Sequence, residues 1–196
     1  MRYASMRSLD ISNGENVGVS LFVQGCHFHC YNCFNSDAWD FNGGKKWTEE
    51  TENRFMELIN RPYIKRVSIL GGEPLADENV EVIYGLLRRI KNNFPTKKIW
   101  IYTGYWVDDI IKDFYESQKL IPPDEPIKPP LSFLRFGVLT VADVIVDGKF
   151  VDALKDPSLL FKGSENQRVI NLKNSDLAKN ALVLWTPGGE NKTNED

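Results

Sequence analysis

Residues 17–33 read Val-Gly-Val-Ser-Leu-Phe-Val-Gln-Gly-Cys-His-Phe-His-Cys-Tyr-Asn-Cys. The first eight are rich in β-branched and aromatic side chains, so residues 17–24 are predicted to form a strand, which Gly25 ends. All three cysteines of the chain follow within the next eight residues, at Cys26, Cys30 and Cys33. The sequence therefore predicts a cysteine-bearing loop at the end of a strand.

Strands and helices alternate along the rest of the chain. We expect strands at 66–70, 98–103, 143–146, 168–170 and 182–185. We expect helices at 48–60, from a cap at Asp77 onward with Val80, Ile83, Leu87 and Ile90 on its inner face, and at 107–118. Such alternation predicts parallel βαβ units with functional residues on the loops after the strands. A unit takes about 30 residues, so an open, partial (β/α)6 TIM-like barrel is the expected fold.

The length and composition indicate one globular domain. The chain has 196 residues, of which 42% are hydrophobic and 26% charged, enough for a substantial core. Residues 121–132 contain five of the ten prolines, which excludes regular structure there and predicts an exposed insertion. We therefore expect a single domain over residues 1–186 and a polar, flexible tail over 187–196.

Charge and hydropathy exclude several classes of protein. The net charge is -3 and the basic residues are scattered, which argues against a nucleic-acid partner. No apolar run approaches the roughly 18 residues of a membrane span, and no apolar signal region follows the first residues, so a cytoplasmic location is expected. Three cysteines packed this closely would also make a poor disulfide framework in a reducing compartment.

The cysteine spacing instead favours a metal site. Cys26, Cys30 and Cys33 form a Cys-x3-Cys-x2-Cys pattern, and three thiolates on a 4Fe-4S cluster leave one iron open to a substrate. The alternative is a structural zinc site in a binding module, because His27 or His29 could complete a Cys3His set. All these candidate ligands lie on one stretch, whereas zinc knuckles draw ligands from two, so the cluster is favoured.

A second motif follows the strand predicted at 66–70. Gly71, Gly72 and Glu73 precede Pro74 and the next helix, and the βα arrangement places them on the same face as the cysteine loop. Glycines allow close approach of the backbone to a ligand, and an acidic side chain can hold an ammonium group. Taken alone, the motif is more often an ordinary turn between a strand and a helix.

Together the two motifs resemble those of the radical-AdoMet enzymes that activate glycyl-radical enzymes. The resemblance covers Leu21 to Asn171 and is strongest to the activases of the anaerobic (class III) ribonucleoside-triphosphate reductase. It is supported by residues 102–105, 143–150 and 161–170, the last of which distinguishes them from the pyruvate formate-lyase activases. An activase of another glycyl-radical enzyme, or a small radical-AdoMet synthase, remains an alternative within the same class.

The resemblance implies a mechanism and its cofactors. A 4Fe-4S cluster on Cys26, Cys30 and Cys33 would bind S-adenosylmethionine at its open iron and reduce it. The resulting 5'-deoxyadenosyl radical would take a hydrogen atom from a glycine of the large reductase subunit. A flavodoxin or a ferredoxin-like protein would supply the electron. Because the cofactor carries the chemistry, no catalytic acid or base is expected.

The resemblance also implies contacts to S-adenosylmethionine. Gly71, Gly72 and Glu73 are expected near its methionine end, and Asn32 and Phe34, which flank Cys33, near its adenine. Thr103, at the end of a strand, is a further candidate, although such a threonine equally often caps a turn. Tyr31 and the two histidines are expected to pack around the cluster rather than bind it.

Overall fold

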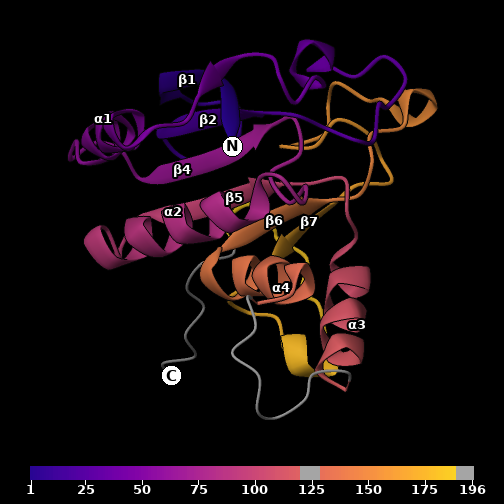
Figure 1. The fold of residues 1–196 in the computed structure, drawn as a ribbon. Helices are drawn as coiled ribbons and strands as arrows, with labels where there is room; N and C mark the ends of the chain where they lie inside the picture. Colours follow the sequence, from indigo (N-terminus) through magenta and orange to yellow (C-terminus); the bar gives the residue numbers. More distant parts are fainter. Residues whose placement is uncertain (120–128, 189–196) are drawn as a thin grey trace, which may run out of the picture.

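The computed structural model describes residues 1–119 and 129–188. Its strands form one open, seven-stranded sheet, with the helices packed along one side (Figure 1). The strands are β1 (Arg2–Asp10), β2 (Gly18–Gln24), β3 (Lys45–Lys46), β4 (Arg66–Gly71), β5 (Lys98–Tyr102), β6 (Val144–Asp147) and β7 (Arg168–Asn171). The helices are α1 (Glu49–Ile59), α2 (Val80–Asn93), α3 (Val107–Gln118) and α4 (Leu131–Val141), with short 3-10 turns η1 (Ser36–Ala38), η2 (Asp152–Leu154) and η3 (Leu177–Lys179).

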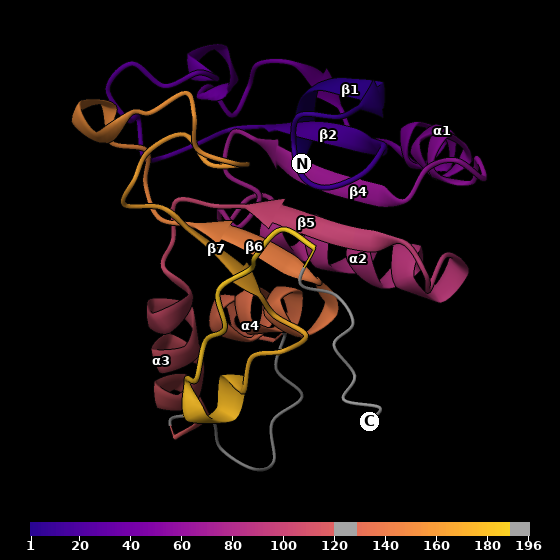
Figure 2. The same ribbon diagram turned by 180° about the vertical axis from the view of Figure 1, so that it is seen from behind.

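Four parallel strands form the centre of the sheet. The strand order is β3-β1-β2-β4-β5-β6-β7, and the four central strands β2, β4, β5 and β6 run parallel to one another. The flanking strands β1 and β7 are antiparallel to β2 and β6. The view from behind shows the sheet in front of α2 and α4 (Figure 2). The loops that leave β2, β4 and β5 therefore meet at the same edge of the sheet.

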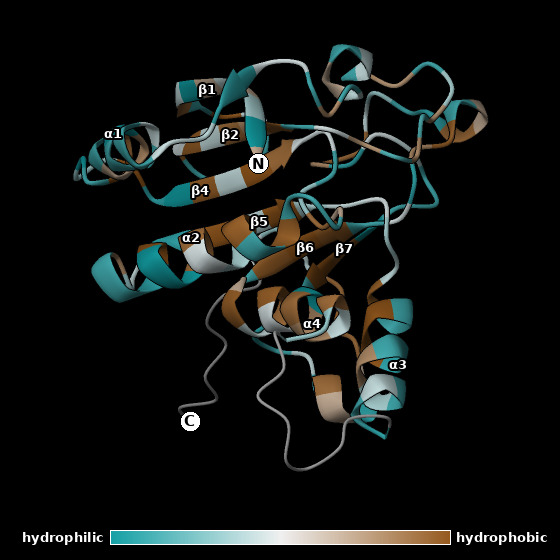
Figure 3. Cartoon of the chain, viewed as in Figure 1, coloured by the Kyte–Doolittle hydropathy of each residue, from teal (hydrophilic) through white to brown (hydrophobic). Residues whose placement is uncertain are grey.

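The two faces of the sheet bury different side chains. On the helical face, side chains from the four parallel strands join the helices in the main core, including Leu21, Ile69, Ile101 and Ile145. Figure 3 shows the apolar character of these central strands. The alternate residues point to the opposite face, where Phe22, Leu70 and Tyr102 line a cavity. The period of two along each strand thus separates the core from the site.

The helix predicted at 48–60 is confirmed as α1, and its cap is the one expected. The Thr48 side chain accepts a hydrogen bond from the Thr51 amide, which satisfies one of the free donors at the helix start. The start predicted for α2 was wrong. Asn79, not Asp77, precedes its first turn, and the Asn79 side chain makes no capping bond there.

Several expected elements differ from those observed. The alternating α/β pattern is confirmed. The six parallel strands of a (β/α)6 barrel are not observed, because only four strands of the described, open sheet are mutually parallel. The sequence did not predict β1 or α4, and α4 begins at residue 131, inside the expected insertion. Residues 121–128 of that insertion and 189–196 of the expected tail lie outside the described residues.

The prediction of a strand at residues 182–185 was wrong. These residues run beside β7 and make one isolated bridge, between Ile170 and Leu184. The Trp185 amide also donates to the Val169 carbonyl at 2.8 Å. These hydrogen bonds to β7 are too few for residues 182–185 to form a strand of the sheet. In the ranges 1–119 and 129–188, the helices are all too short or too polar to cross a bilayer.

A buried ion pair between Arg66 and Asp10 anchors the connection between β1 and β2. Arg66 and Asp10 have side chains 1% exposed, and Arg66 Nη2 lies 3.2 Å from Asp10 Oδ1. Arg66 also donates to the carbonyls of Asn13 and Glu15 at 2.6 and 2.9 Å. Burial acts to raise the pKa of Asp10, but hydrogen bonds from Asn13 and Arg66 outweigh it and lower the pKa to about 2. The ionised pair is therefore favoured by the folded state.

Because the pKa of Asp10 is lower in the folded state than its ordinary 3.8, the pair stabilises the protein above pH 4. That contribution, about 2 kcal/mol, is lost as the pH falls from 4 to 2. We expect Asp10→Asn to lower the free energy of unfolding at pH 7 by about 3 kcal/mol and to flatten its acid dependence. Denaturant titrations at several pH values measure the free energy of unfolding and its pH dependence, and Asp109→Asn, at an exposed position, is the control. The same free energy of unfolding at every pH for the two variants would contradict a stabilising role of the Asp10–Arg66 pair.

Candidate metal centre

The cysteine loop leaves β2 and is closed at its base by two main-chain hydrogen bonds. The Gly25 amide donates to the Ala38 carbonyl at 2.8 Å, and the Cys26 amide donates to the Trp39 carbonyl at 3.0 Å. The intervening residues are thus held as a closed loop at the carboxyl end of β2. Loop closure at a rigid strand fixes the position of the first cysteine.

Two buried amide side chains reinforce this base. Gln24, 2% exposed, donates to the carbonyls of Asp37 and Asp40 at 3.1 and 2.9 Å. Asn79, 1% exposed, donates to the carbonyls of Gln24 and Glu73, both at 3.0 Å. Asn79 therefore joins the cysteine loop to the loop after β4. Neither residue was singled out by the sequence, where a lone Gln or Asn carries no signal.

Within the loop, the backbone turns at two left-handed residues. His29 has φ 46° and Asn32 has φ 52°, and both residue types tolerate this region better than most. The Cys33 amide donates to the Cys30 carbonyl at 3.1 Å, which closes a tight turn between these two cysteines. The Asn35 amide points at Cys33 Sγ at 3.4 Å. A donor aimed at a ligating sulfur tunes the potential of an iron-sulfur cluster.

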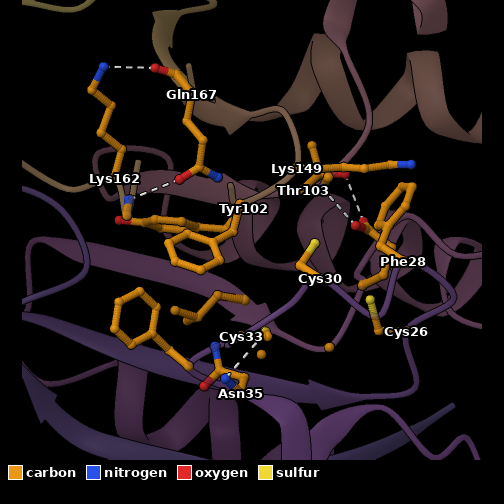
Figure 4. Close-up of a pocket in the computed structure, with 18 of the residues that line it drawn as sticks. Cys26, Phe28, Cys30, Cys33, Asn35, Tyr102, Thr103, Lys149, Lys162 and Gln167 are labelled. Atoms are coloured by element: carbon orange, nitrogen blue, oxygen red, sulfur yellow. Dashed lines mark hydrogen bonds between the residues drawn. The ribbon is translucent and has the colours of Figure 1, made fainter. Parts of the chain in front are cut away.

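All three cysteines line one cavity of about 480 Å³. Figure 4 shows them around this cavity with Phe28 and Thr103. Cys26 is buried, Cys30 and Cys33 are half-buried, and none forms a disulfide. Burial raises the pKa of Cys26 to about 11 and also raises the pKa of Cys30. The thiols of Cys26 and Cys30 are therefore protonated near neutral pH, and their binding to a metal as thiolates must release protons.

This arrangement fits a cluster better than a single ion. Among the described residues, no three His, Cys, Asp or Glu side chains converge closely enough to hold one metal ion. In a cube-shaped cluster each cysteine binds a different iron, so the sulfurs surround a larger volume. The resemblance implies such a cluster, and three thiols around one cavity fit it.

The two histidines are engaged elsewhere, as expected of packing residues. His27 Nε2 lies 3.1 Å from a Glu78 carboxylate oxygen, and its ring packs on Phe41 with centroids 4.4 Å apart. His29 stacks on Trp39 with centroids 4.7 Å apart. Neither ring belongs to the cavity lining. The zinc alternative therefore lacks its fourth ligand.

Gly71 and Gly72 are required by the packing of the two loops. Gly71 has φ 108°, which side chains rarely adopt. A Cβ at Gly72 would lie 2.4 Å from the Gly25 carbonyl oxygen and 2.9 Å from that of Ala38. The Glu73 amide donates to that same Gly25 carbonyl at 2.7 Å. The glycine pair therefore lets the loop after β4 lie directly against the base of the cysteine loop.

Glu73 is a buried carboxylate that ties two loops together. It is 2% exposed and accepts hydrogen bonds from the Leu75 amide at 2.8 Å, the Thr103 hydroxyl at 2.7 Å and the Gly104 amide at 2.8 Å. Burial raises the pKa of Glu73 to about 7, although these hydrogen bonds oppose the shift. A cationic group in the cavity would stabilise its charged form. The site is thus suited to an ammonium group.

The other predicted site residues fall in different places. Phe34 and Thr103 line the cavity with the cysteines and Gly71–Glu73. The Thr103 hydroxyl caps a turn by accepting from the Tyr105 amide at 3.1 Å, in addition to holding Glu73. Asn32 does not line the cavity. Its side-chain amide donates to Asp152 Oδ2 at 3.0 Å instead.

Several cavity-lining residues were not predicted. They are Arg7, Ser12, Asn13, Phe22, Phe28, Asn35, Trp39, Leu70, Tyr102, Gly104, Gly148, Lys149, Phe150, Leu159, Phe161, Lys162, Gly163 and Gln167. The lining residues within 148–150 and 161–167 lie in stretches that supported the resemblance, but no role was assigned to them. The lining residues on β1 and in the loop after it had no sequence signal, because β1 itself was not predicted.

The glycine packing predicts a specific loss of cluster. Gly72→Ala must push the two loops apart, at a cost of about 1–3 kcal/mol, and we expect it to lower the iron bound after anaerobic reconstitution at least several-fold. Gly85→Ala on α2, where an added Cβ meets nothing within 4 Å, is the matched control. Iron content and visible absorbance measure the effect; a Gly72→Ala protein with full cluster would refute the packing argument.

The ligand assignment predicts opposite results for histidine and cysteine variants. The double variant His27→Ala/His29→Ala should retain most of its iron and sulfide, because neither ring faces the cavity. Cys30→Ala should lose nearly all of it, since one ligand is gone. Metal analysis separates the cases, and loss of one bound zinc from the histidine variant would support the zinc alternative.

Comparison with known proteins gives the family. Residues 12–170 match the model of the 4Fe-4S single cluster domain family. The anaerobic ribonucleoside-triphosphate reductase-activating protein of Escherichia coli is 36% identical over 175 residues, covering 88% of this chain and 100% of that protein. The protein of that name from Enterobacteria phage T4 is 32% identical over 169 residues, covering 86% and 93%. The chain therefore belongs to the family of anaerobic ribonucleoside-triphosphate reductase-activating proteins that carry a 4Fe-4S cluster domain.

Proposed function

We propose that this chain is an enzyme that activates an anaerobic ribonucleoside-triphosphate reductase by generating a glycyl radical on it. The observation that carries the proposal is the shared cavity, in which three cysteines face the Gly71–Glu73 loop. The cluster supplies the electron that cleaves S-adenosylmethionine, and this cleavage yields the radical that removes a hydrogen atom from the glycine.

The residues divide between the two cofactors. Cys26, Cys30 and Cys33, which line the cavity, would hold the cluster. The Gly71–Glu73 loop would hold the ammonium group of S-adenosylmethionine, whose charge the buried Glu73 carboxylate would offset. Burying that carboxylate beside a cation costs less than burying either alone. This accounts for a fully buried acid that has hydrogen-bond donors but no salt-bridge partner among the described residues.

Aromatic side chains line part of this space and shield it from water. Phe34 packs on Phe150 with centroids 5.1 Å apart, and Phe28 packs edge-on against Tyr105 at 5.0 Å. In this proposal Phe34 contacts the adenine, which is supported by its position in the cavity lining and by its exposed fraction of 63%. Asn32 would reach the same ligand after exchanging its bond to Asp152, and Thr103 contributes by holding Glu73. A reactive radical needs such exclusion of water and solvent solutes.

The open sheet is, in this proposal, a shortened partial barrel of the radical-AdoMet type within a single domain over residues 1–186. All its crossover connections return to the same side, as in a barrel. The electron comes from a flavodoxin or a ferredoxin-like protein. The electron donor binds beside Cys30 and Cys33. These two cysteines are half-buried, so the donor can approach the cluster most closely there.

The proposal is tested by two products measured together. The reconstituted protein, reduced with dithionite and given S-adenosylmethionine, should form 5'-deoxyadenosine, and with the reductase present a glycyl radical should appear by electron paramagnetic resonance. Glu73→Gln, which removes the charge but keeps the shape, should weaken S-adenosylmethionine binding about tenfold or more. Absence of 5'-deoxyadenosine from protein with an intact cluster would overturn the proposal.

A further inference from the structure

The stretch of residues 161–170 supported the resemblance but has no role in the site so far. Three of its side chains bind the main chain of residues 148–151, the loop that follows β6. The hydrogen bonds run from the Val151 amide to Ser164 Oγ at 3.2 Å, from Asn166 Nδ2 to the Lys149 carbonyl at 2.8 Å, and from Gln167 Nε2 to the Gly148 carbonyl at 2.8 Å. We call Ser164, Asn166 and Gln167 the clamp, and residues 148–151 the clamped loop.

The clamp is itself held in place by further hydrogen bonds. Gln167 Oε1 accepts from the Gly163 amide at 2.9 Å and from the Ser164 amide at 3.3 Å. The Lys162 ammonium group donates to the Gln167 carbonyl at 2.8 Å, as Figure 4 shows. Ser164 is 0% exposed. Because both ends of the Gln167 amide are bonded, its side chain has one orientation, and the clamped loop is fixed relative to it.

The clamped loop contacts the cysteine loop before and after Cys30. The Lys149 ammonium nitrogen lies 4.7 Å from the centre of the Phe28 ring, and Figure 4 shows these two side chains together. Phe150 packs on Phe34 with ring centroids 5.1 Å apart. All five residues line the same cavity. The clamped loop is therefore a wall of the cavity beside the second cysteine.

Two groups of the clamped loop act on the Cys30 sulfur. Burial raises the pKa of the Cys30 thiol, as does the charge of Cys33, whereas a hydrogen bond from the Phe150 amide and the charge of Lys149 act to lower it. Both groups of the clamped loop thus favour negative charge on this sulfur. Reduction of an iron-sulfur cluster adds negative charge to it, so an amide donor and a cation beside one ligand favour the reduced state.

From these contacts we infer that the clamp holds the Phe150 amide and the Lys149 ammonium group against Cys30, and that it thereby raises the reduction potential of the cluster. The clamp residues are positioning residues, because they act on the cluster through the clamped loop. The inference rests on the proposed function for the binding of a cluster by the three cysteines. A cluster with a higher potential is reduced more readily by its electron donor, so the 161–170 stretch serves electron supply.

The test is the reduction potential of the reconstituted full chain, measured by redox titration followed by electron paramagnetic resonance, without S-adenosylmethionine or reductase. Gln167→Met removes both ends of the amide at similar length and equal charge. We expect the equilibrium constant for reduction to fall about tenfold, which makes the potential about 59 mV more negative for one electron. Gln118→Met, at an exposed position at the end of α3, is the matched control and should leave the potential unchanged. A Gln167→Met potential equal to or higher than that of the wild type would overturn the inference.

A double-mutant cycle separates positioning from a general loss of packing. Lys149→Met alone should lower the potential, because the cation is lost. In the Gln167→Met background it should have little further effect, since the loosened loop no longer holds the lysine against Cys30. Additive shifts, or no shift in Lys149→Met, would overturn the inference.

Asn166→Ala removes a single bond of the clamp and replaces Gln167→Met if that variant does not fold. It should shift the potential in the same direction by a smaller amount, and an unchanged potential would also overturn the inference. Formation of 5'-deoxyadenosine by the wild type is measured separately. Its absence, with the expected shifts of potential present, would overturn the proposed function and leave the role of the clamp standing.

Discussion

The closure of the cysteine loop against the sheet is the constraint on which the site depends. The hydrogen bonds of Gly25 and Cys26 to Ala38 and Trp39 fix both ends of a segment that has little core of its own. Gly72 allows the neighbouring loop to press against this base, because a side chain there would collide with the Gly25 carbonyl. Three sulfurs can then be presented by a short loop with the precision that a metal cluster requires.

The same packing brings the second half of the site into place. Glu73 follows the glycines directly, and its hydrogen bonds to Thr103 and Gly104 tie the end of β4 to the end of β5. A buried acid and three thiols thus share one cavity, with aromatic side chains at its mouth. The protein supplies position, charge and exclusion of water, whereas the difficult bond cleavage belongs to the cofactors.

The sequence predicted the elements whose signals are local. The strand before the cysteines, the Thr48 cap and the apolar spacing of α2 are all read from short patterns, and the structure contains each of them. The strand β1 was missed because eight of its nine residues are exposed or only partly buried, so its sequence shows no clear alternation. The roles of Gln24 and Asn79 could not be predicted, since they depend on contacts between distant segments.

The most direct test is the electron paramagnetic resonance spectrum of the reduced cluster. It is recorded in the presence of S-adenosylmethionine labelled with ¹⁵N in its amino group. If three cysteines hold a cluster whose open iron faces Gly71–Glu73, we expect about four irons per chain and a magnetic coupling between the labelled nitrogen and the cluster. A spectrum unchanged by the labelled ligand would place S-adenosylmethionine elsewhere. A single tightly bound zinc, with no such spectrum, would contradict the cluster itself.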